Sequence, residues 1–200
     1  MRKGYRLLLV LLGLAVSTAH GQSKTGTAVG EFTLIEPSAR IAALVNAGVA
    51  VNDGLQSVYY NPAAIGAFRT PSVQFTHSEW LAGINYEYVA TAIPLRYSGA
   101  LFASVTALNS GDIEVRTVGQ PLGTGERYHV SDVALGVGFG RTITDGFSAG
   151  VQANYISETI WHSTLHTFTV NVGTVYRLTD DGLQLGSSIS NFGGQGQFHG

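Results

Sequence analysis

Histidine and carboxylate side chains that share a strand face are the first candidates for chemistry in this sequence. Glu158, His162 and His166 would lie on one face if a strand continued through them, and both side-chain types bind zinc. Two histidines in a connecting loop, with no further ligand cluster, are more typical of a polar loop. We therefore expect no metal site and no cofactor.

Nucleophilic catalysis has no better support in the sequence. His129 and Asp132 lie close together, but no serine stands in a Gly-x-Ser-x-Gly element. The chain has no cysteine, which excludes disulfides, thiolate metal sites and a cysteine nucleophile. A glycine-rich run at 137–140 is not followed by a predicted helix, so it does not resemble a dinucleotide loop. The sequence predicts that the protein is not an enzyme.

The composition is unusual for a soluble domain. Charged residues make up 12% of the 200 residues, hydrophobic residues 44%, and 26 residues are glycine. No stretch after the N-terminus is apolar for the roughly 20 residues that a membrane helix needs. Moderate hydrophobicity spread evenly, with much glycine and little charge, is typical of a transmembrane β-barrel. The net charge of −2 gives no reason to expect a nucleic-acid partner.

Residues 1–21 have the layout of a signal peptide. Basic residues at positions 2, 3 and 6 precede a short apolar run at 7–16, and small residues lead to a cleavage point after Gly21. The apolar run is too short to span a membrane. We therefore expect the mature protein to work outside the cytoplasm.

Residues 22–70 form a compact segment rich in small residues before the first strand. The stretch 38–48 is predicted to be a helix that Ser38 caps and Gly48 ends. Asn61 is biased toward an extended backbone by the following Pro62, which can itself begin a short helical turn. The residues alone leave two interpretations open: a cap packed on a sheet, or a plug inside a barrel.

From residue 72 onward, side chains alternate with period two, which predicts β-strands. One face of these strands is apolar, whereas the other is made of glycine, serine, asparagine and glutamine with almost no charge. Such a face suits a lumen that packs against something rather than a surface in bulk water. The pattern predicts about seven strands within residues 71–200, namely 72–79, 84–95, 99–116, 128–141, 146–160, 166–177 and 182–190.

Aromatic residues and connections add to the barrel prediction. Tight turns at 96–99, 144–146 and 179–182 alternate with longer connections at 118–127 and 158–166, as in outer-membrane barrels. Two interpretations fit the aromatic residues near strand ends and in or beside loops: girdles at the membrane interfaces, or ordinary aromatic residues of a β-sheet. These residues are Tyr86, Tyr88, Tyr155, Tyr176, Trp80 and Trp161.

The third predicted strand contains the turn-forming stretch 109–112, which we interpret as a bulge or bend because splitting the strand would break the alternation of short and long connections. Seven strands is an odd number, whereas single-chain bacterial barrels have an even number. We therefore expect this sequence to be the N-terminal part of a longer barrel.

Several stretches resemble the PorV/PorQ family of outer-membrane proteins, within the broader FadL-like superfamily. The stretches are Ser38-Ala39-Arg40 leading through Asp53 to Asn61-Pro62-Ala63, then 75–88, 108–113 and 131–136, and the resemblance as a whole runs from about Gly30 to Gly194. The resemblance implies an all-β, FadL-type transmembrane barrel with a small N-terminal helical plug, or hatch, in its lumen. It assigns Arg40, Asp53, Asn61, Pro62 and Ala63 to the hatch, and His77, Glu79 and Trp80 to a strand end.

The same resemblance implies a function at the outer membrane of a Gram-negative cell. The first hypothesis is a cargo-handling component of type IX-like protein secretion, with secreted proteins or secretion-system components as partners besides outer-membrane lipid. The alternative is a FadL-like channel for passive uptake of hydrophobic small molecules. Both hypotheses predict the same fold.

Overall fold

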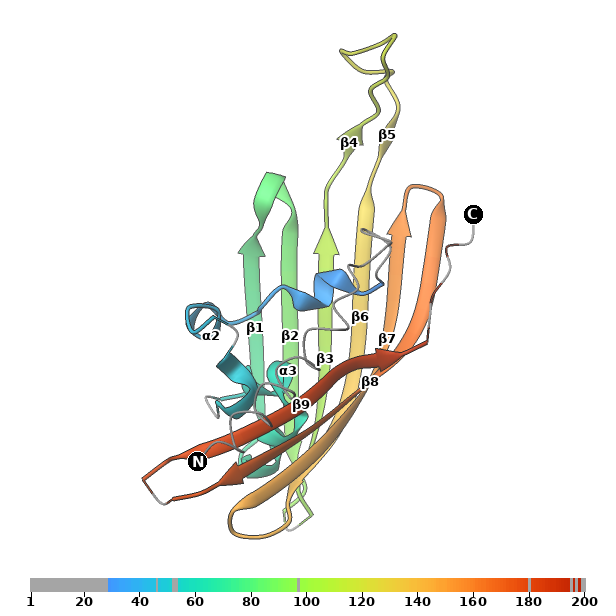
Figure 1. Cartoon of the computed structure of the whole chain (residues 1–200). Coiled ribbons are helices and arrows are strands. Elements are labelled where there is room, and N and C mark those ends of the chain that lie inside the picture. Colours follow the sequence, from blue (N-terminus) through green and yellow to red (C-terminus); the bar gives the residue numbers. More distant parts are fainter. Residues whose placement is uncertain are drawn as a thin grey trace, which may run out of the picture.

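A single bent antiparallel sheet forms most of the computed structural model (Figure 1). The structure describes residues 29–45, 47–51, 54–96, 98–179, 181–194, 196 and 198. The predicted signal peptide and Asp53 lie outside the described residues. The seven strands of the sheet follow one another in sequence order and are β1 (Ser72–Glu79), β2 (Asn85–Pro94), β3 (Ala100–Asn109), β6 (Val130–Thr142), β7 (Phe147–Ile160), β8 (Ser163–Arg177) and β9 (Gln184–Gly193).

The prediction of a mainly β fold with about seven antiparallel strands is therefore confirmed. Each strand pairs with the one before it. Within the described residues β1 and β9 are the edges of the sheet and do not pair with each other, so the sheet is not a closed barrel.

The third predicted strand, 99–116, is shorter than predicted. β3 ends at Asn109, whose side-chain oxygen accepts a hydrogen bond of 2.7 Å from the Gly111 nitrogen, and Gly111 has a φ of 66°. Asparagine and glycine favour such turns. Beyond it, β4 (Ile113–Glu114) pairs with β5 (Arg127–Tyr128) in a second, two-stranded sheet. Figure 1 shows this β4–β5 arm, residues 110–129, extending past one end of the main sheet.

The long connection predicted at 158–166 is wrong. β7 continues to Ile160, which pairs with Ser163, so only Trp161 and His162 form the turn. Trp161 adopts a φ of 56°, which lets two residues reverse the chain. Glu158 then points to the inner face of the sheet, while His166 on the outer face hydrogen-bonds the Tyr155 hydroxyl at 2.9 Å.

The two faces of the sheet are inverted relative to those of a water-soluble protein. Large apolar side chains on the convex face are exposed, among them Val137 at 64% and Phe168 at 70%. Polar side chains on the concave face are buried, including Gln152, Asn154 and Asn171. The prediction that the polar face packs against something is confirmed, because residues 29–70 cover it.

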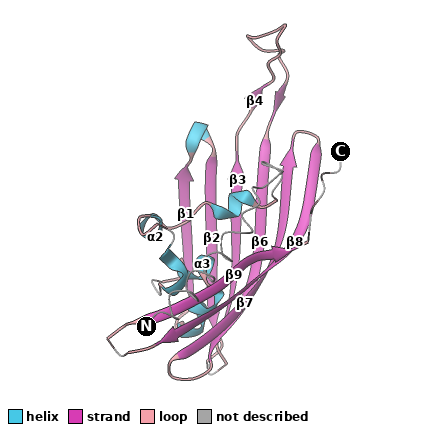
Figure 2. Ribbon diagram, viewed as in Figure 1, coloured by secondary structure: helices cyan, strands magenta, loops and turns pink. Residues whose placement is uncertain are grey.

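These residues, the N-terminal segment, form short helical turns that lie across the concave face (Figure 2). The elements are η1 (Glu31–Leu34), α2 (Ala39–Ala42), η2 (Ala47–Ala50), α3 (Ser57–Tyr60) and η3 (Pro62–Ala67), and a further turn, η4 (Leu81–Gly83), joins β1 to β2. No helix in the described part of the chain has the length and hydropathy to cross a membrane.

The helix predicted at 38–48 is largely wrong. Ser38 does cap it, since its side chain accepts from the Ile41 nitrogen at 3.3 Å, but α2 lasts a single turn. Val45 has a φ of 56°, which ends the helical path. Gly48 lies inside η2, where a Cβ would come within 2.6 Å of the Ile41 side chain, so close packing explains this glycine better than a helix end.

Two of the candidate girdle tyrosines belong to the core instead. Tyr86 and Tyr88 are 0% and 1% exposed and point to the concave face of β2. The Tyr59 ring of the N-terminal segment packs edge-on against the Tyr88 ring, with centroids 5.7 Å apart. The outward positions of β2 carry Glu87 and Val89 instead.

Candidate functional site

The buried Asn61 side chain joins the N-terminal segment to itself and to the sheet. Its oxygen accepts from the Ala63 nitrogen at 2.9 Å, which caps η3. Its amide nitrogen donates to the carbonyl of Val49 at 2.8 Å and to that of Thr174 in β8 at 3.0 Å. The extended backbone of Asn61 and the helical turn that begins at Pro62 were both predicted from the sequence and are confirmed.

Three glycines on neighbouring strands receive this turn. Gly140, Gly150 and Gly173 pair directly opposite one another across β6, β7 and β8 and form a row on the concave face. A Cβ on Gly140 would lie 2.8 Å from the Pro62 carbonyl oxygen, and one on Gly150 would lie 2.6 Å from the Ala63 nitrogen. A side chain on Gly140 or Gly150 would therefore collide with the backbone of Pro62 or Ala63, and one on Gly173 would collide with the Asn61 side chain.

We call the glycine row together with Asn61, Pro62 and Ala63 the seat. Its neighbours extend the same close packing. A Cβ on Gly66 would lie 2.8 Å from the backbone of Arg141, and the Thr142 hydroxyl donates to the Gly66 carbonyl at 3.0 Å. The seat is thus a close-packed contact in which glycines of the sheet meet the backbone of residues 62–63 and the Asn61 side chain, and this packing fixes the depth of the segment over the sheet.

The other end of the segment is held by hydrogen bonds. The Gly30 nitrogen donates to the Glu158 carboxylate at 2.5 Å, and the Asn191 amide donates to the Thr33 hydroxyl at 2.9 Å. The Tyr59 hydroxyl donates to the carbonyls of Thr33 and Ile35. We call residues 30–35 and these three side chains the latch.

Tyr59 is suited to the donor role in the latch. Burial raises the pKa of its hydroxyl far above the ordinary value, and the neighbouring Tyr86 and Tyr60 raise this pKa further. The hydroxyl therefore stays protonated over the physiological range and keeps its proton for the two carbonyls.

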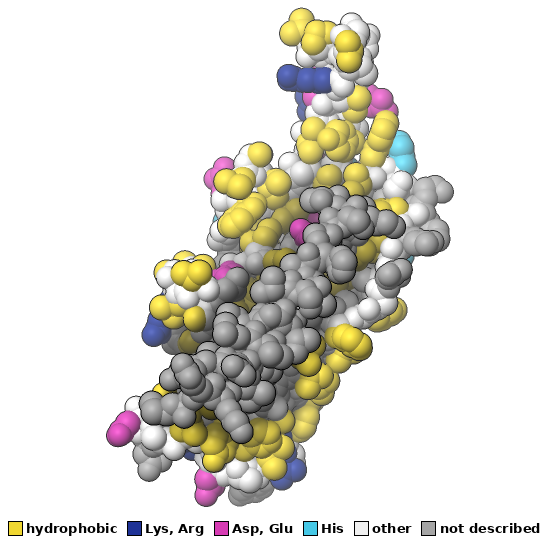
Figure 3. All heavy atoms as spheres, in the orientation of Figure 1, with side chains coloured by type: hydrophobic (Ala, Val, Ile, Leu, Met, Phe, Trp, Pro, Cys, Tyr) yellow, Lys and Arg dark blue, Asp and Glu magenta, His cyan; other side chains and the backbone are white. Residues whose placement is uncertain are grey.

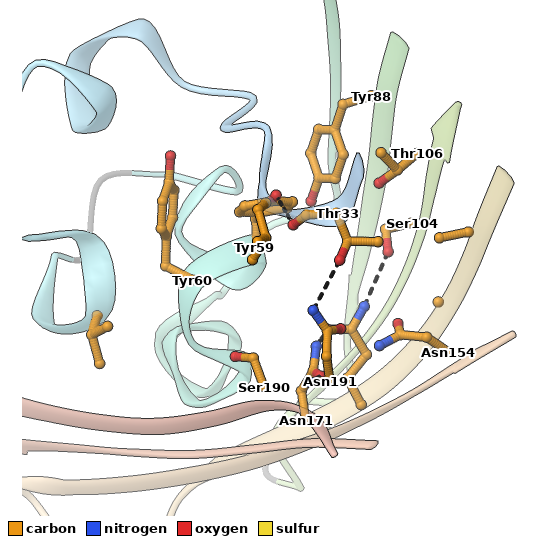
Figure 4. Close-up of a pocket in the computed structure, with 15 residues that line it drawn as sticks. Thr33, Tyr59, Tyr60, Tyr88, Ser104, Thr106, Asn154, Asn171, Ser190 and Asn191 are labelled. Atoms are coloured by element: carbon orange, nitrogen blue, oxygen red, sulfur yellow. Dashed lines mark hydrogen bonds between the residues drawn. The ribbon is translucent and has the colours of Figure 1, made fainter. Parts of the chain in front are cut away.

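Between the latch and the seat lies a cavity of about 190 Å³ (Figure 4). One side is a chain of side-chain hydrogen bonds: the Asn171 amide donates to Gln152 at 3.1 Å, and Gln152 donates to the Ser104 hydroxyl at 3.2 Å. Nearby, Asn154 donates to the Thr169 hydroxyl at 3.3 Å. The cavity wall therefore offers donors and acceptors but carries no charged side chain among the residues that line it.

Arg40, which the resemblance also assigns to the hatch, does not join the seat. Arg40 lies on the exposed side of α2, whereas Asn61, Pro62 and Ala63 are buried together. Asp53 is outside the described residues, so its assignment stays a prediction.

The strand-end group, His77, Glu79 and Trp80, lies apart from the N-terminal segment. His77 and Glu79 share the outward face of β1, as the sequence predicted, and Trp80 begins the connection to β2. The His77 ring nitrogen lies 2.6 Å from the Glu87 carboxylate on the neighbouring strand. In the described part of the chain, no three histidine, aspartate or glutamate side chains gather as a possible metal site.

Sequence reasoning missed the glycine row and the latch partners Glu158 and Asn191. The alternation placed glycines on the polar face of the strands. That three of them lie side by side follows from the register of β6, β7 and β8, which the alternation does not give. The sequence signal that could have indicated the glycine row is the Asn61-Pro62-Ala63 turn. This turn can approach a sheet so closely only where the sheet has no side chains.

No protein-family model matches the chain, and a search of curated proteins finds no significant match.

Proposed function

We propose that this chain is part of an outer-membrane β-barrel of the PorV/PorQ type, with the N-terminal segment as a hatch in the lumen. One observation carries the proposal: the sheet exposes its apolar face and buries its polar face. Soluble proteins rarely expose apolar patches of more than a few hundred Å², whereas barrel walls are apolar outside and polar inside.

Strand length supports the same proposal. A barrel strand needs about 9–11 residues to cross a bilayer at its usual tilt. β2, β3 and β9 have 10 residues each, and β7 and β8 have 14 and 15. The charged side chains visible in Figure 3 include groups on the β4–β5 arm, below its tip, and at the opposite turns, as expected for two wetted ends.

The unpaired edges of β1 and β9 are a further argument for closure. Open, apolar strand edges promote aggregation unless they are covered or paired. We propose that additional strands pair with both edges and complete the barrel around the N-terminal segment.

Within this fold, we favour handling of secreted protein cargo, as the family resemblance implies. The β4–β5 arm extends beyond the sheet and exposes Val118 and Leu122 almost completely at its tip. Exposed apolar side chains on a projecting arm can contact another protein. The alternative is passive uptake of hydrophobic molecules, and the N-terminal segment that covers the concave face of the sheet favours it. However, the wall of the cavity beneath the N-terminal segment is polar. An apolar solute passing along it would bury the wall's amides without hydrogen bonds, which is costly.

Separation of inner and outer membranes from the native host tests the barrel proposal. We expect the protein in the outer-membrane fraction, resistant to urea extraction, with electrophoretic mobility that changes on boiling. Recovery as a soluble or urea-extractable protein would contradict it.

A paired substitution tests the cargo role. Val118→Ser with Leu122→Ser should reduce the amount of secreted protein in the medium severalfold, with unchanged barrel content in the membrane. The control, Ile143→Ser with Leu183→Ser, alters two apolar residues that are 58% and 60% exposed in turns at the other end of the sheet. Equal secretion by both variants would show that the arm has no part in handling cargo. A separate uptake assay tests the alternative: it would be favoured if wild-type cells took up a labelled fatty acid faster than cells without the gene.

A further inference from the structure

We propose that the cavity between the latch and the seat binds a small, neutral, polyhydroxylated molecule of about monosaccharide size. The proposal concerns this cavity alone and holds whether the protein handles cargo or admits solutes. It rests on the chemistry of the wall, on one unsatisfied hydroxyl and on size.

The wall selects for a neutral ligand that both donates and accepts hydrogen bonds. Its polar groups are the amides and hydroxyls of Gln152, Asn154, Asn171, Asn191, Ser104, Thr106, Ser190 and Thr33. Because none of the lining side chains is charged, an ionic ligand would lose its hydration without a counter-charge. An apolar ligand would strip water from the amides and give nothing in return.

The Tyr88 hydroxyl is the specific indication of a missing partner. Tyr88 is 1% exposed and lines the cavity, yet its hydroxyl has no hydrogen-bond partner in the described part of the chain. Buried hydroxyls in native proteins are normally satisfied. Figure 4 shows the Tyr88 ring reaching from β2 toward Tyr59 and Thr33. An oxygen of a bound molecule in the cavity can therefore serve as the hydrogen-bond partner of the Tyr88 hydroxyl.

The aromatic rings give the cavity an apolar side. Tyr59 and Tyr60 come from the N-terminal segment and Tyr88 from β2, whereas the amides come from β7, β8 and β9 (Figure 4). A sugar ring has the same two-sided chemistry, with C–H groups that pack on aromatic surface and hydroxyls that bond to amides. The volume of about 190 Å³ is below the roughly 300 Å³ of the smallest drug-sized sites, which suits a monosaccharide better than a long acyl chain.

Ligand-observed NMR on the full chain tests the proposal. The protein is purified in a polyoxyethylene detergent, which has no sugar headgroup, and titrated with D-glucose and myo-inositol. Cyclohexanol serves as a ring of similar size that lacks most hydroxyls. We expect saturable binding of at least one polyol and weaker binding of cyclohexanol.

Three single substitutions locate the binding. Tyr88→Phe removes only the hydroxyl and should weaken polyol binding by about tenfold, the change expected when one buried hydrogen bond is lost. Ser104→Ala, on the neighbouring strand β3, should weaken it severalfold, and Tyr155→Phe, on the outer face, should leave it unchanged. The proposal is overturned if neither polyol binds saturably, if cyclohexanol binds as tightly, or if Tyr88→Phe and Ser104→Ala both bind like the wild type.

Discussion

The seat and the latch hold the same N-terminal segment to the same sheet by different means. At the seat, residues 61–63 pack directly on three glycines, and the contact depends on shape. At the latch, residues 30–35 are held by side-chain hydrogen bonds from Glu158, Asn191 and Tyr59. Hydrogen bonds can be exchanged for bonds to water at small net cost, whereas a close-packed contact cannot. The segment should therefore open at the latch before it leaves the seat.

The largest effect is expected from a side chain in the glycine row. Gly150→Ala places a Cβ 2.6 Å from the Ala63 nitrogen, and backbone cannot move aside cheaply. Overpacking of this kind costs about 1–3 kcal/mol, and we expect the upper end. The unfolding midpoint in denaturant measures the loss. Gly119→Ala is the control, since a Cβ there meets nothing within 4 Å, and equal midpoints for the two variants would disprove the close contact.

Asn61 should show the next largest effect. Asn61→Ala removes the cap of η3 and leaves the Val49 and Thr174 carbonyls without this donor, at a cost of about 2 kcal/mol. Asn61→Asp keeps the capping oxygen but loses the amide donor, so both variants should be destabilised. If Asn61→Asp were as stable as the wild type, the hydrogen bond from the Asn61 amide to the Thr174 carbonyl in β8 would not contribute to stability.

A smaller, local effect is expected at the latch. Glu158→Gln replaces the charged acceptor of the Gly30 nitrogen with a neutral one, a change of about 1 kcal/mol. Hydrogen exchange should accelerate at residues 30–35 and stay unchanged at 61–67. Glu79→Gln, on the outward face of β1, is the control, and equal acceleration in both regions would mean that the segment opens as one unit.

Much of the fold follows from local pattern in the sequence. Period-two alternation located the seven strands and assigned Phe168 outward and Asn171 inward, because one strand residue in two faces each side. The turn at Asn61 and Pro62 could also be predicted, because proline restricts the backbone of the residue before it and this effect is local.

The errors arise where tertiary contacts decide. Tyr86 and Tyr88 were candidates for a membrane girdle, but the N-terminal segment covers them, which the β2 sequence cannot reveal. The helix predicted at 38–48 stops after one turn, Val45 adopts a left-handed backbone, and Gly48 serves close packing against Ile41 instead of ending a helix. The glycine row depends on the register of three strands, and register is a property of the whole sheet.

Solvent accessibility of a spin label on the convex face tests the central claim most directly. The chain has no cysteine, so Phe168→Cys and Val118→Cys each provide a single labelling site in the native outer membrane. If the convex face contacts lipid, a nitroxide at position 168 will collide more often with oxygen than with a water-soluble nickel complex, and one at position 118 will show the reverse. Equal access of the nickel complex to both positions would contradict the proposal that this face lies in the membrane.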